Sequence, residues 1–194
     1  MKNNNKNLDL IIDFTINRAM LYIALFIFLV NPIYSQINEI ENKYLWISRE
    51  SMITEKSIES ALLFASESGF DKVFLQIRGR GDAFYNSSIV EKNINIQEEF
   101  DPLEYAIKLG HEFNLEIHVW MNCYIIWSSN TAPINDQHIL NTNPLWTEAD
   151  IYGKLDARID LKSPKSPSWE GIYLSPMHQE VNQYLREVIK EVYE

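Results

Sequence analysis

The sequence predicts an α/β fold in which parallel strands alternate with helices that cover the sheet. Three short apolar segments, at residues 44–48, 73–78 and 115–122, show the period-two alternation that is typical of strands. One helical stretch separates each of these segments from the next. Strands joined by a single helix are expected to be parallel, with right-handed crossovers and flanking helices.

Composition narrows the class of protein. The chain has 194 residues, of which 46% are apolar, and a formal net charge of -10. That length suits one domain with a substantial core, and the acidic balance argues against nucleic acid as a partner. Cys123 is the only cysteine, so an intrachain disulfide and a thiolate zinc cluster are excluded, and we expect a small buried residue rather than a nucleophile. No two histidines have metal-ligand spacing, and we expect neither a metal site nor a cofactor.

The N-terminus has the pattern of a secretory signal. An uninterrupted apolar run at residues 19–30 follows three basic residues, and it is shorter than the about 20 residues that span a bilayer. Ser35 offers a small residue for cleavage. We therefore predict a signal peptide at 1–35, a linker at 36–43, a secreted or periplasmic, cell-envelope location, and no stable membrane insertion after cleavage. An uncleaved anchor is the alternative.

The first unit of the domain consists of a strand at 44–48 and a helix from Thr54 to about Ser68. Thr54 is a good helix N-cap, and Gly69 is a natural helix stop. The apolar positions of this helix recur at helical spacing. The second strand follows at 73–78.

A long polar loop, residues 79–100, connects the second strand to the second helix, and loops of this length are usually functional or mobile. Asp101 is expected to cap the helix, with Pro102 in the first turn and Glu104 completing a capping box. Asn114 should end it. The expected buried stripe consists of Leu103, Ala106, Ile107 and Phe113.

The third strand, 115–122, precedes an irregular stretch from 123 to 169 that we interpret as an elaborate loop over the C-terminal face of the sheet. Ser175-Pro176 then opens a last helix, which should lead to a fourth strand. Because the sequence stops at Glu194, we expect it to be a fragment. The buried stripe expected for the last helix is Val181, Tyr184, Leu185, Val188 and Val192.

Polar residues gather where the second strand ends, in the run Gly79-Arg80-Gly81-Asp82. The carboxyl ends of buried parallel strands are where α/β proteins place their sites. One interpretation is that Arg78, Arg80 and Asp82 line a pocket for a polyhydroxylated or anionic ligand. The other is that Arg78 and Asp82 form a salt bridge that only shapes the loop. Phe84 replaces the third glycine of a dinucleotide fingerprint, so a Rossmann site is not expected.

The third strand presents His118, Trp120 and Asn122 on the same parity as Arg78 of the second strand, which favours a shared pocket over a core role for His118. A pocket role predicts that Arg78→Ala and His118→Ala weaken ligand binding and leave thermal unfolding nearly unchanged. A salt-bridge or core role predicts instead a large loss of stability with unaltered activity. The role of His138 stays open.

Aromatic residues in the loops, among them Trp127, suit the apolar faces of sugar rings when polar donors lie beside them. Trp146 and Trp169 have the alternative role of anchoring their loops.

Five segments follow one another along the chain: YLWIS, FLQIRGRGDAFYNS, DPLEYAIKLGHEFNLEIHVWMN, HILNTNPLW and YLSPMHQEVNQYL. Through these segments, residues 44–194 resemble the glycosyl hydrolase-like 10 family of bacterial TIM-barrel proteins. The resemblance implies a (β/α)8 barrel, of which this chain holds about the first three βα units, and hydrolysis of O-glycosyl bonds in a cell-envelope or extracellular glycan, with peptidoglycan-type strands as one substrate class. Alternatives are a non-catalytic carbohydrate-binding barrel and a structural envelope protein.

The resemblance also implies roles for individual residues. Asp82 is the candidate catalytic residue, and the family's acidic motif at the end of the fourth strand should follow Glu194, so the chain alone is expected to be inactive. Cys123 stands where many members have proline. The residues expected to bind the glycan are Arg78, Arg80, Tyr85, His118, Trp120, Asn122, Tyr124 and Trp127.

Overall fold

The computed structural model of the chain describes Met20, Tyr22 and residues 42–194. The predicted signal peptide and most of the predicted linker therefore lie outside the described residues, apart from Met20 and Tyr22, which are helical and exposed. Within the part of the chain that is described, no helix has both the length and the apolar character needed to cross a membrane. Residues 42–194 form one folding unit.

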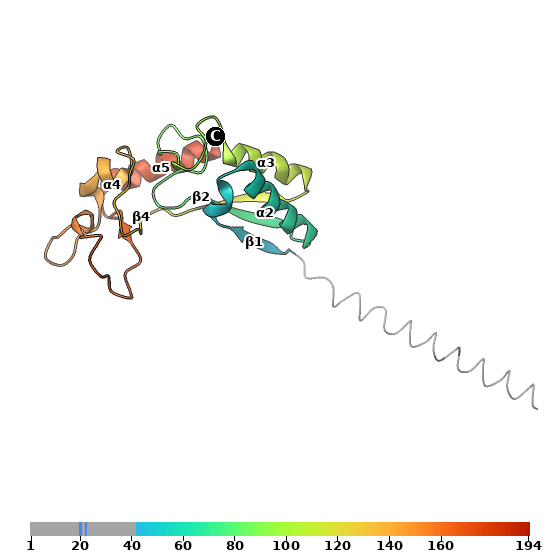
Figure 1. Ribbon diagram of the computed structural model, residues 1–194, viewed down its shortest axis with the longest axis horizontal. Coiled ribbons are helices and arrows are strands. Elements are labelled where there is room, and N and C mark those ends of the chain that lie inside the picture. Colours follow the sequence, from blue (N-terminus) through green and yellow to red (C-terminus); the bar gives the residue numbers. More distant parts are fainter. Residues whose placement is uncertain (1–19, 21, 23–41) are drawn as a thin grey trace, which may run out of the picture. The chain divides into compact units, whose positions relative to one another are not determined.

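Three parallel strands form the central sheet, in the order β1-β2-β3 (Figure 1). They are β1 (Tyr44–Ile47), β2 (Lys72–Arg78) and β3 (Glu116–Met121). Val73 in β2 pairs with Leu45 on one side and with Ile117 on the other. The predicted α/β class and the three predicted strands are confirmed. This succession of βα units is the one with which a (β/α)8 barrel opens.

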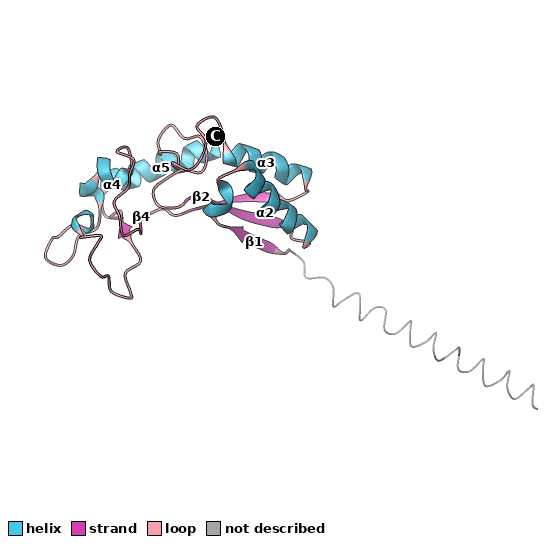
Figure 2. Ribbon diagram, in the orientation of Figure 1, coloured by secondary structure: helices cyan, strands magenta, loops and turns pink. Residues whose placement is uncertain are grey.

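Two helices connect these strands, α2 (Glu55–Glu67) and α3 (Pro102–Glu112) (Figure 2). Thr54 caps α2 by accepting a hydrogen bond from the Ser57 amide at 3.2 Å, as predicted. Asp101 caps α3 through one oxygen, and its other oxygen accepts from the Asn86 amide at 2.9 Å. The predicted return bond from Glu104 is not formed in this segment, so the capping box is incomplete.

The helices cover one face of the sheet. Val73, Leu75 and Ile77 are fully buried on that face, as the alternation predicts. Ile107 of α3 belongs to the expected buried stripe but is 39% exposed, and the apolar Val119 on the edge strand β3 is 41% exposed. The buried side chains that α2 and α3 contribute are Ile58, Leu62, Ala65, Pro102, Ala106 and Leu109.

The other face carries a row of stacked rings, one from each strand. The rings of Trp46 and Phe74 lie 4.8 Å apart between centroids, and those of Phe74 and His118 lie 5.0 Å apart. Trp46 is 60% exposed, so this face is open to solvent in the structure. His118 belongs to this open face.

The segment after β3 is more ordered than the sequence predicted. β4 (Ile125–Trp127) and β5 (Ile172–Tyr173) pair as antiparallel strands around a second core. Strands of two or three residues are too short to show an alternation in the sequence. Between them lie α4 (Ile139–Thr142), η2 (Pro144–Trp146) and η3 (Asp156–Arg158).

The last helix, α5 (Gln179–Tyr193), joins the two cores. Val181 and Leu185 are buried in the second core, and Val188 is buried in the first, as the predicted stripe requires. The helix begins later than the expected Ser175-Pro176, because the Ser175 amide donates to the carbonyl of Trp146 at 2.8 Å and a turn follows before His178.

Arg78 connects the end of the sheet to α5. The register between β2 and β3 shifts at this point, since Gln76 pairs with Trp120 whereas Arg78 pairs with Met121. The side chain is completely buried, and its Nη1 donates to the carbonyls of Asn122 and Cys123. The guanidinium carbon lies 5.8 Å from the centre of the Tyr184 ring, and Nη2 lies 3.5 Å from the Tyr184 hydroxyl. One buried cation therefore ties β2, the end of β3 and α5 together.

This geometry replaces the earlier expectation for Arg78→Ala. The variant should lose about 3 kcal/mol of unfolding free energy, because charge-assisted hydrogen bonds to two carbonyls disappear and a buried hole remains. Urea unfolding measures this loss. Arg186→Ala, at an exposed position of the same α5, is the control and should change stability by less than about 0.5 kcal/mol. Equal stability of the two variants would contradict the anchoring role.

Candidate functional site

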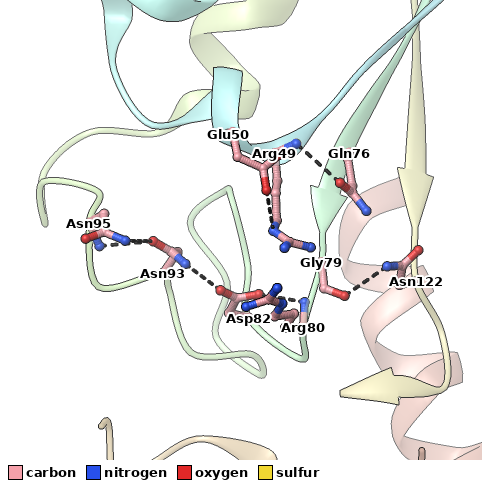
Figure 3. Close-up of polar contacts among 9 residues, drawn as sticks. All are labelled: Arg49, Glu50, Gln76, Gly79, Arg80, Asp82, Asn93, Asn95 and Asn122. Carbon is pink, nitrogen blue, oxygen red and sulfur yellow. Dashed lines mark hydrogen bonds and ion pairs between the residues drawn. The ribbon is translucent and has the colours of Figure 1, made fainter. Parts of the chain in front are cut away.

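A cleft of about 290 Å³ lies at the carboxyl ends of β1 and β2. Arg49 and Glu50 reach it directly after β1, and Arg80 and Asp82 reach it directly after β2 (Figure 3). This is the edge of a parallel sheet at which α/β proteins bind their ligands. The remaining lining residues are Ile53, Phe84, Asn93, Ile94, Asn95 and Trp127.

Backbone hydrogen bonds hold the loop that supplies most of this cleft. After β2 the chain turns back, and the Phe84 amide donates to the carbonyl of Ile77 at 2.8 Å. The Ala83 amide donates to the carbonyl of Glu91 at 2.8 Å, and the Asn93 amide donates to the carbonyl of Ala83 at 2.9 Å. Residues 79–84 and 91–93 therefore form a fixed floor rather than a loose connection.

Two glycines allow the loop to pass close to its neighbours. A Cβ on Gly79 would lie 2.3 Å from Cδ of Arg49, so a larger residue here would require the Arg49 side chain to move. Gly81 has a φ of +84°, and a Cβ there would lie 3.0 Å from the side chain of Ile139. Gly81 thus requires glycine for its backbone conformation, whereas Gly79 makes room for the present position of the Arg49 side chain.

The carboxylate of Asp82 is fixed within the cleft. Only 8% of the residue is exposed, and Oδ1 accepts a hydrogen bond from the Arg80 amide at 2.9 Å. Oδ2 accepts from Nδ2 of Asn93, whose own Oδ1 accepts from the Asn95 amide at 3.0 Å (Figure 3). A carboxylate held on both sides in this way presents a constant position to a ligand.

A second, smaller cavity of about 90 Å³ adjoins the cleft and shares Asp82, Asn93, Ile94 and Trp127 with it. His138 lines this cavity and is almost fully buried. Its Nδ1 accepts from the Leu140 amide at 3.1 Å, so Nε2 carries the hydrogen and donates to the carbonyl of Arg80 at 2.7 Å. Burial lowers the pKa of His138, which favours this neutral form. His138, whose role the sequence did not decide, thus positions the Arg80 backbone.

The charges of the cleft are mixed. Arg49 contacts the carboxylate of Glu50 at 3.3 Å, and a hydrogen bond from Ser48, supported by its own amide and the nearby arginines, lowers the pKa of Glu50. Glu91 lies in the adjoining cavity, where burial and the negative charge of Asp82 raise its pKa to about 7. The site therefore offers guanidinium groups, the carboxylates of Glu50 and Asp82, and the carboxyl group of Glu91, which can hold a proton near neutral pH.

The structure brings three of the predicted site residues together: Arg80, Asp82 and Trp127 all line the cleft. Asn122 lies beneath them, and its Nδ2 donates to the carbonyl of Gly79 at 3.0 Å. Asn122 therefore supports the floor of the site.

Arg78 does not reach the cleft, because the shifted register at the end of β2 directs it towards α5. Among the described residues it forms no ion pair with Asp82, so the alternative salt bridge is not formed either. His118 lies on the open sheet face, with Nε2 at 2.8 Å from Oε1 of Glu116. The predicted convergence of Arg78 and His118 is therefore not observed.

Three further predicted residues lie outside the cleft lining. Tyr85 is buried, its hydroxyl donates to Glu191 of α5 at 3.3 Å, and burial raises its pKa to about 12. Tyr124 packs against the second core. Trp120 is half-buried on β3 opposite Gln76. Glycan binding by these residues stays a prediction.

Among the residues of the site that sequence reasoning missed are Arg49, Glu50, Glu91 and Asn93. The first two directly follow a predicted strand, so the rule that sites form at the carboxyl ends of strands could have found them. The other two lie in the middle of the long loop, and only its folded path places them beside Asp82.

Metal binding gains no support from the described residues, since they contain no group of three or more histidine, cysteine, aspartate or glutamate side chains arranged around a common point. The polar groups of the cleft suit hydrogen bonding to hydroxyls, and Trp127 adds an apolar surface of the kind that packs against a sugar ring.

Comparison with known proteins identifies relatives of this chain. Glycosyl hydrolase YngK of Bacillus subtilis (strain 168) is 33% identical over 93 residues, which make up 44% of this chain and 18% of that protein. The matched part thus spans less than a fifth of the relative's length. A crystal structure of a hypothetical protein from Ruminiclostridium thermocellum ATCC 27405 matches with a TM-score of 0.53 at 13% identity, covering 77% of this chain and 70% of that one, which indicates a shared fold.

The family model described as Glycosyl hydrolase-like 10 matches residues 46–194. The match begins within β1 and covers the loop that carries Asp82 and the whole of α5. The chain therefore belongs to the glycosyl hydrolase-like 10 family.

Proposed function

We propose that the cleft binds a glycan and that the full-length protein hydrolyses O-glycosyl bonds. The observation that carries this proposal is the fixed carboxylate of Asp82, which lines one cleft with Arg80 and Trp127 at the carboxyl end of β2. Glycoside hydrolysis uses carboxyl groups beside the scissile bond, and sugar binding uses polar donors next to an aromatic ring. Asp82 is the proposed catalytic residue.

The substrate proposed is a chain of sugars rather than a single sugar. The cleft shares Asp82 and Trp127 with the small cavity, and it shares Ile53 and Asn95 with a cleft of about 310 Å³ at the start of α2. Three adjoining hollows with common walls suit consecutive sugar units. Peptidoglycan-type strands are the substrate class we favour.

Export to the cell envelope is part of the same proposal. It is supported by the apolar run at residues 19–30 and its basic flank, which have the length and charge of a secretory signal. A glycan of the envelope would be accessible only to a protein on that side of the membrane.

A second candidate function is carbohydrate binding without hydrolysis. Both oxygens of Asp82 already accept hydrogen bonds, from the Arg80 amide and from Asn93, and this favours a binding role for the carboxylate. Incubating the full-length protein with soluble glycan fragments separates the two candidates. Release of shorter fragments, lost in Asp82→Asn, supports hydrolysis, whereas binding without cleavage supports the second candidate. Failure to bind any glycan contradicts both.

Arg80→Ala tests the cleft directly. The side chain is half-exposed in the cleft, and removal of one charge-assisted hydrogen bond to a sugar should weaken glycan affinity about 10-fold or more, as measured by calorimetry. Thermal unfolding should change little. Arg158→Ala, at an exposed position in η3, is the matched control and should bind as the wild type does. Unchanged affinity in Arg80→Ala would argue against glycan binding at this cleft.

A further inference from the structure

Glu91 lies next to Asp82 although eight residues separate them in the sequence. The carbonyl of Glu91 accepts the hydrogen bond from the Ala83 amide, which fixes the backbone of Glu91 beside the residue that follows Asp82. Both acidic residues line the same small cavity, together with His138 and Trp127. The loop therefore presents two carboxyl groups to one space.

The surroundings of the two carboxyl groups differ. Both oxygens of Asp82 accept hydrogen bonds, whereas Oε2 of Glu91 is buried and has no hydrogen-bond partner among the described residues. A buried oxygen without a donor is costly as an anion and much less so as a protonated group. The unpaired oxygen of Glu91 is thus suited to carry a hydrogen, and Asp82 is suited to carry the negative charge.

We propose that Glu91 is the proton donor that acts together with Asp82, an inference that rests on the proposed hydrolytic function. The charged or titratable groups facing Glu91 across the cavity are Asp82 and the neutral His138, and the first of these favours the protonated form. Burial and Asp82 raise the pKa of Glu91 to about 7, so part of the protein holds this proton at neutral pH. Glycosidases use two carboxyl groups in different surroundings, so that one stays protonated as the general acid and the other stays ionised.

The proposed step is a hydrolysis. Glu91 gives its proton to the glycosidic oxygen while the bond from the anomeric carbon to that oxygen breaks, and the electron pair stays on the departing oxygen. The carboxylate of Asp82 stabilises the positive charge that develops on the sugar. The oxygen of a water molecule then bonds to the anomeric carbon, and one proton of that water returns to Glu91. One water is consumed, and two sugar hydroxyls are formed.

Kinetics of Glu91→Gln in the full-length protein test this role. Loss of the donor should lower kcat about 100-fold or more on a natural glycan, with little change in KM. The same variant should retain most of its activity on aryl glycosides of the same sugar whose phenol is acidic enough to leave without a proton. Glu99→Gln, at an exposed position in the same loop, is the control and should behave as the wild type does. A loss of equal size on both substrate types would mean a structural role.

The pH profile gives a second readout. Wild-type kcat should fall on the alkaline side with an apparent pKa near 7, and this limb should be absent from the residual activity of Glu91→Gln. A wild type that cleaves no glycan would remove the proposed function and, with it, this role. Cleavage that keeps its rate and its alkaline limb in Glu91→Gln would overturn the role of Glu91 and leave the proposed function standing.

Stability measurements test the protonation of Glu91 without any substrate. Its pKa is raised from 4.5 to about 7 in the folded chain, so the folded state binds the proton more tightly than the unfolded state does. That contribution to stability is complete below about pH 4.5 and is lost as pH rises through about 7. Glu91→Gln, which cannot ionise, should therefore gain stability relative to the wild type between pH 5 and 8 in urea unfolding. A difference that does not change with pH would show that Glu91 ionises normally.

Discussion

The buried guanidinium of Arg78 is the constraint on which the site depends. Arg78 is the last residue of β2, and its hydrogen bonds reach the carbonyls that follow β3, while its charge lies beside the ring of Tyr184 in α5. A completely buried cation must keep such partners, because its desolvation is not otherwise offset. The point at which the site loop leaves the sheet is therefore fixed on three elements at once.

The loop after Arg78 is held at its far side as well. Glu191 of α5 accepts hydrogen bonds from the Tyr85 hydroxyl, from Ser87 and from both the amide and the hydroxyl of Ser88. Asp82 lies in this loop, and the groups that hold its carboxylate, the Arg80 amide and Asn93, belong to the same fixed segment. Because the carboxylate is already ordered, ligand binding does not carry the entropic cost of ordering it. The length of the loop reflects a folded structure rather than mobility.

Local signals in the sequence predicted where α2 and α3 begin, where α3 ends, and which face of β2 is buried. Thr54, Asp101 and Pro102 mark the starts of α2 and α3, and Asn114, with a φ of 56°, follows the end of α3. These residues act through their own backbone and nearest neighbours, so the sequence carries the information directly. The alternation in β2 likewise predicted that Val73, Leu75 and Ile77 face the helices.

The sequence could not predict features that depend on contacts between distant segments. The register shift after Gln76 directs Arg78 to α5 instead of to the side of His118, and nothing in the run of residues marks it. Glu91 reaches Asp82 only because residues 91–93 run back along Ala83. The site residues that directly follow a strand were therefore predictable from the sequence. Glu91 and Asn93, which reach the site only through the folded path of the loop, were not.

A crystal structure of the full-length protein with a bound oligosaccharide tests the central claim most directly. The account predicts a sugar ring in the cleft, packed against Trp127, with a hydroxyl or the glycosidic oxygen about 3 Å from the carboxyl groups of Asp82 or Glu91. An oligosaccharide bound instead over the aromatic row of Trp46, Phe74 and His118, with the Asp82 cleft empty, would contradict it.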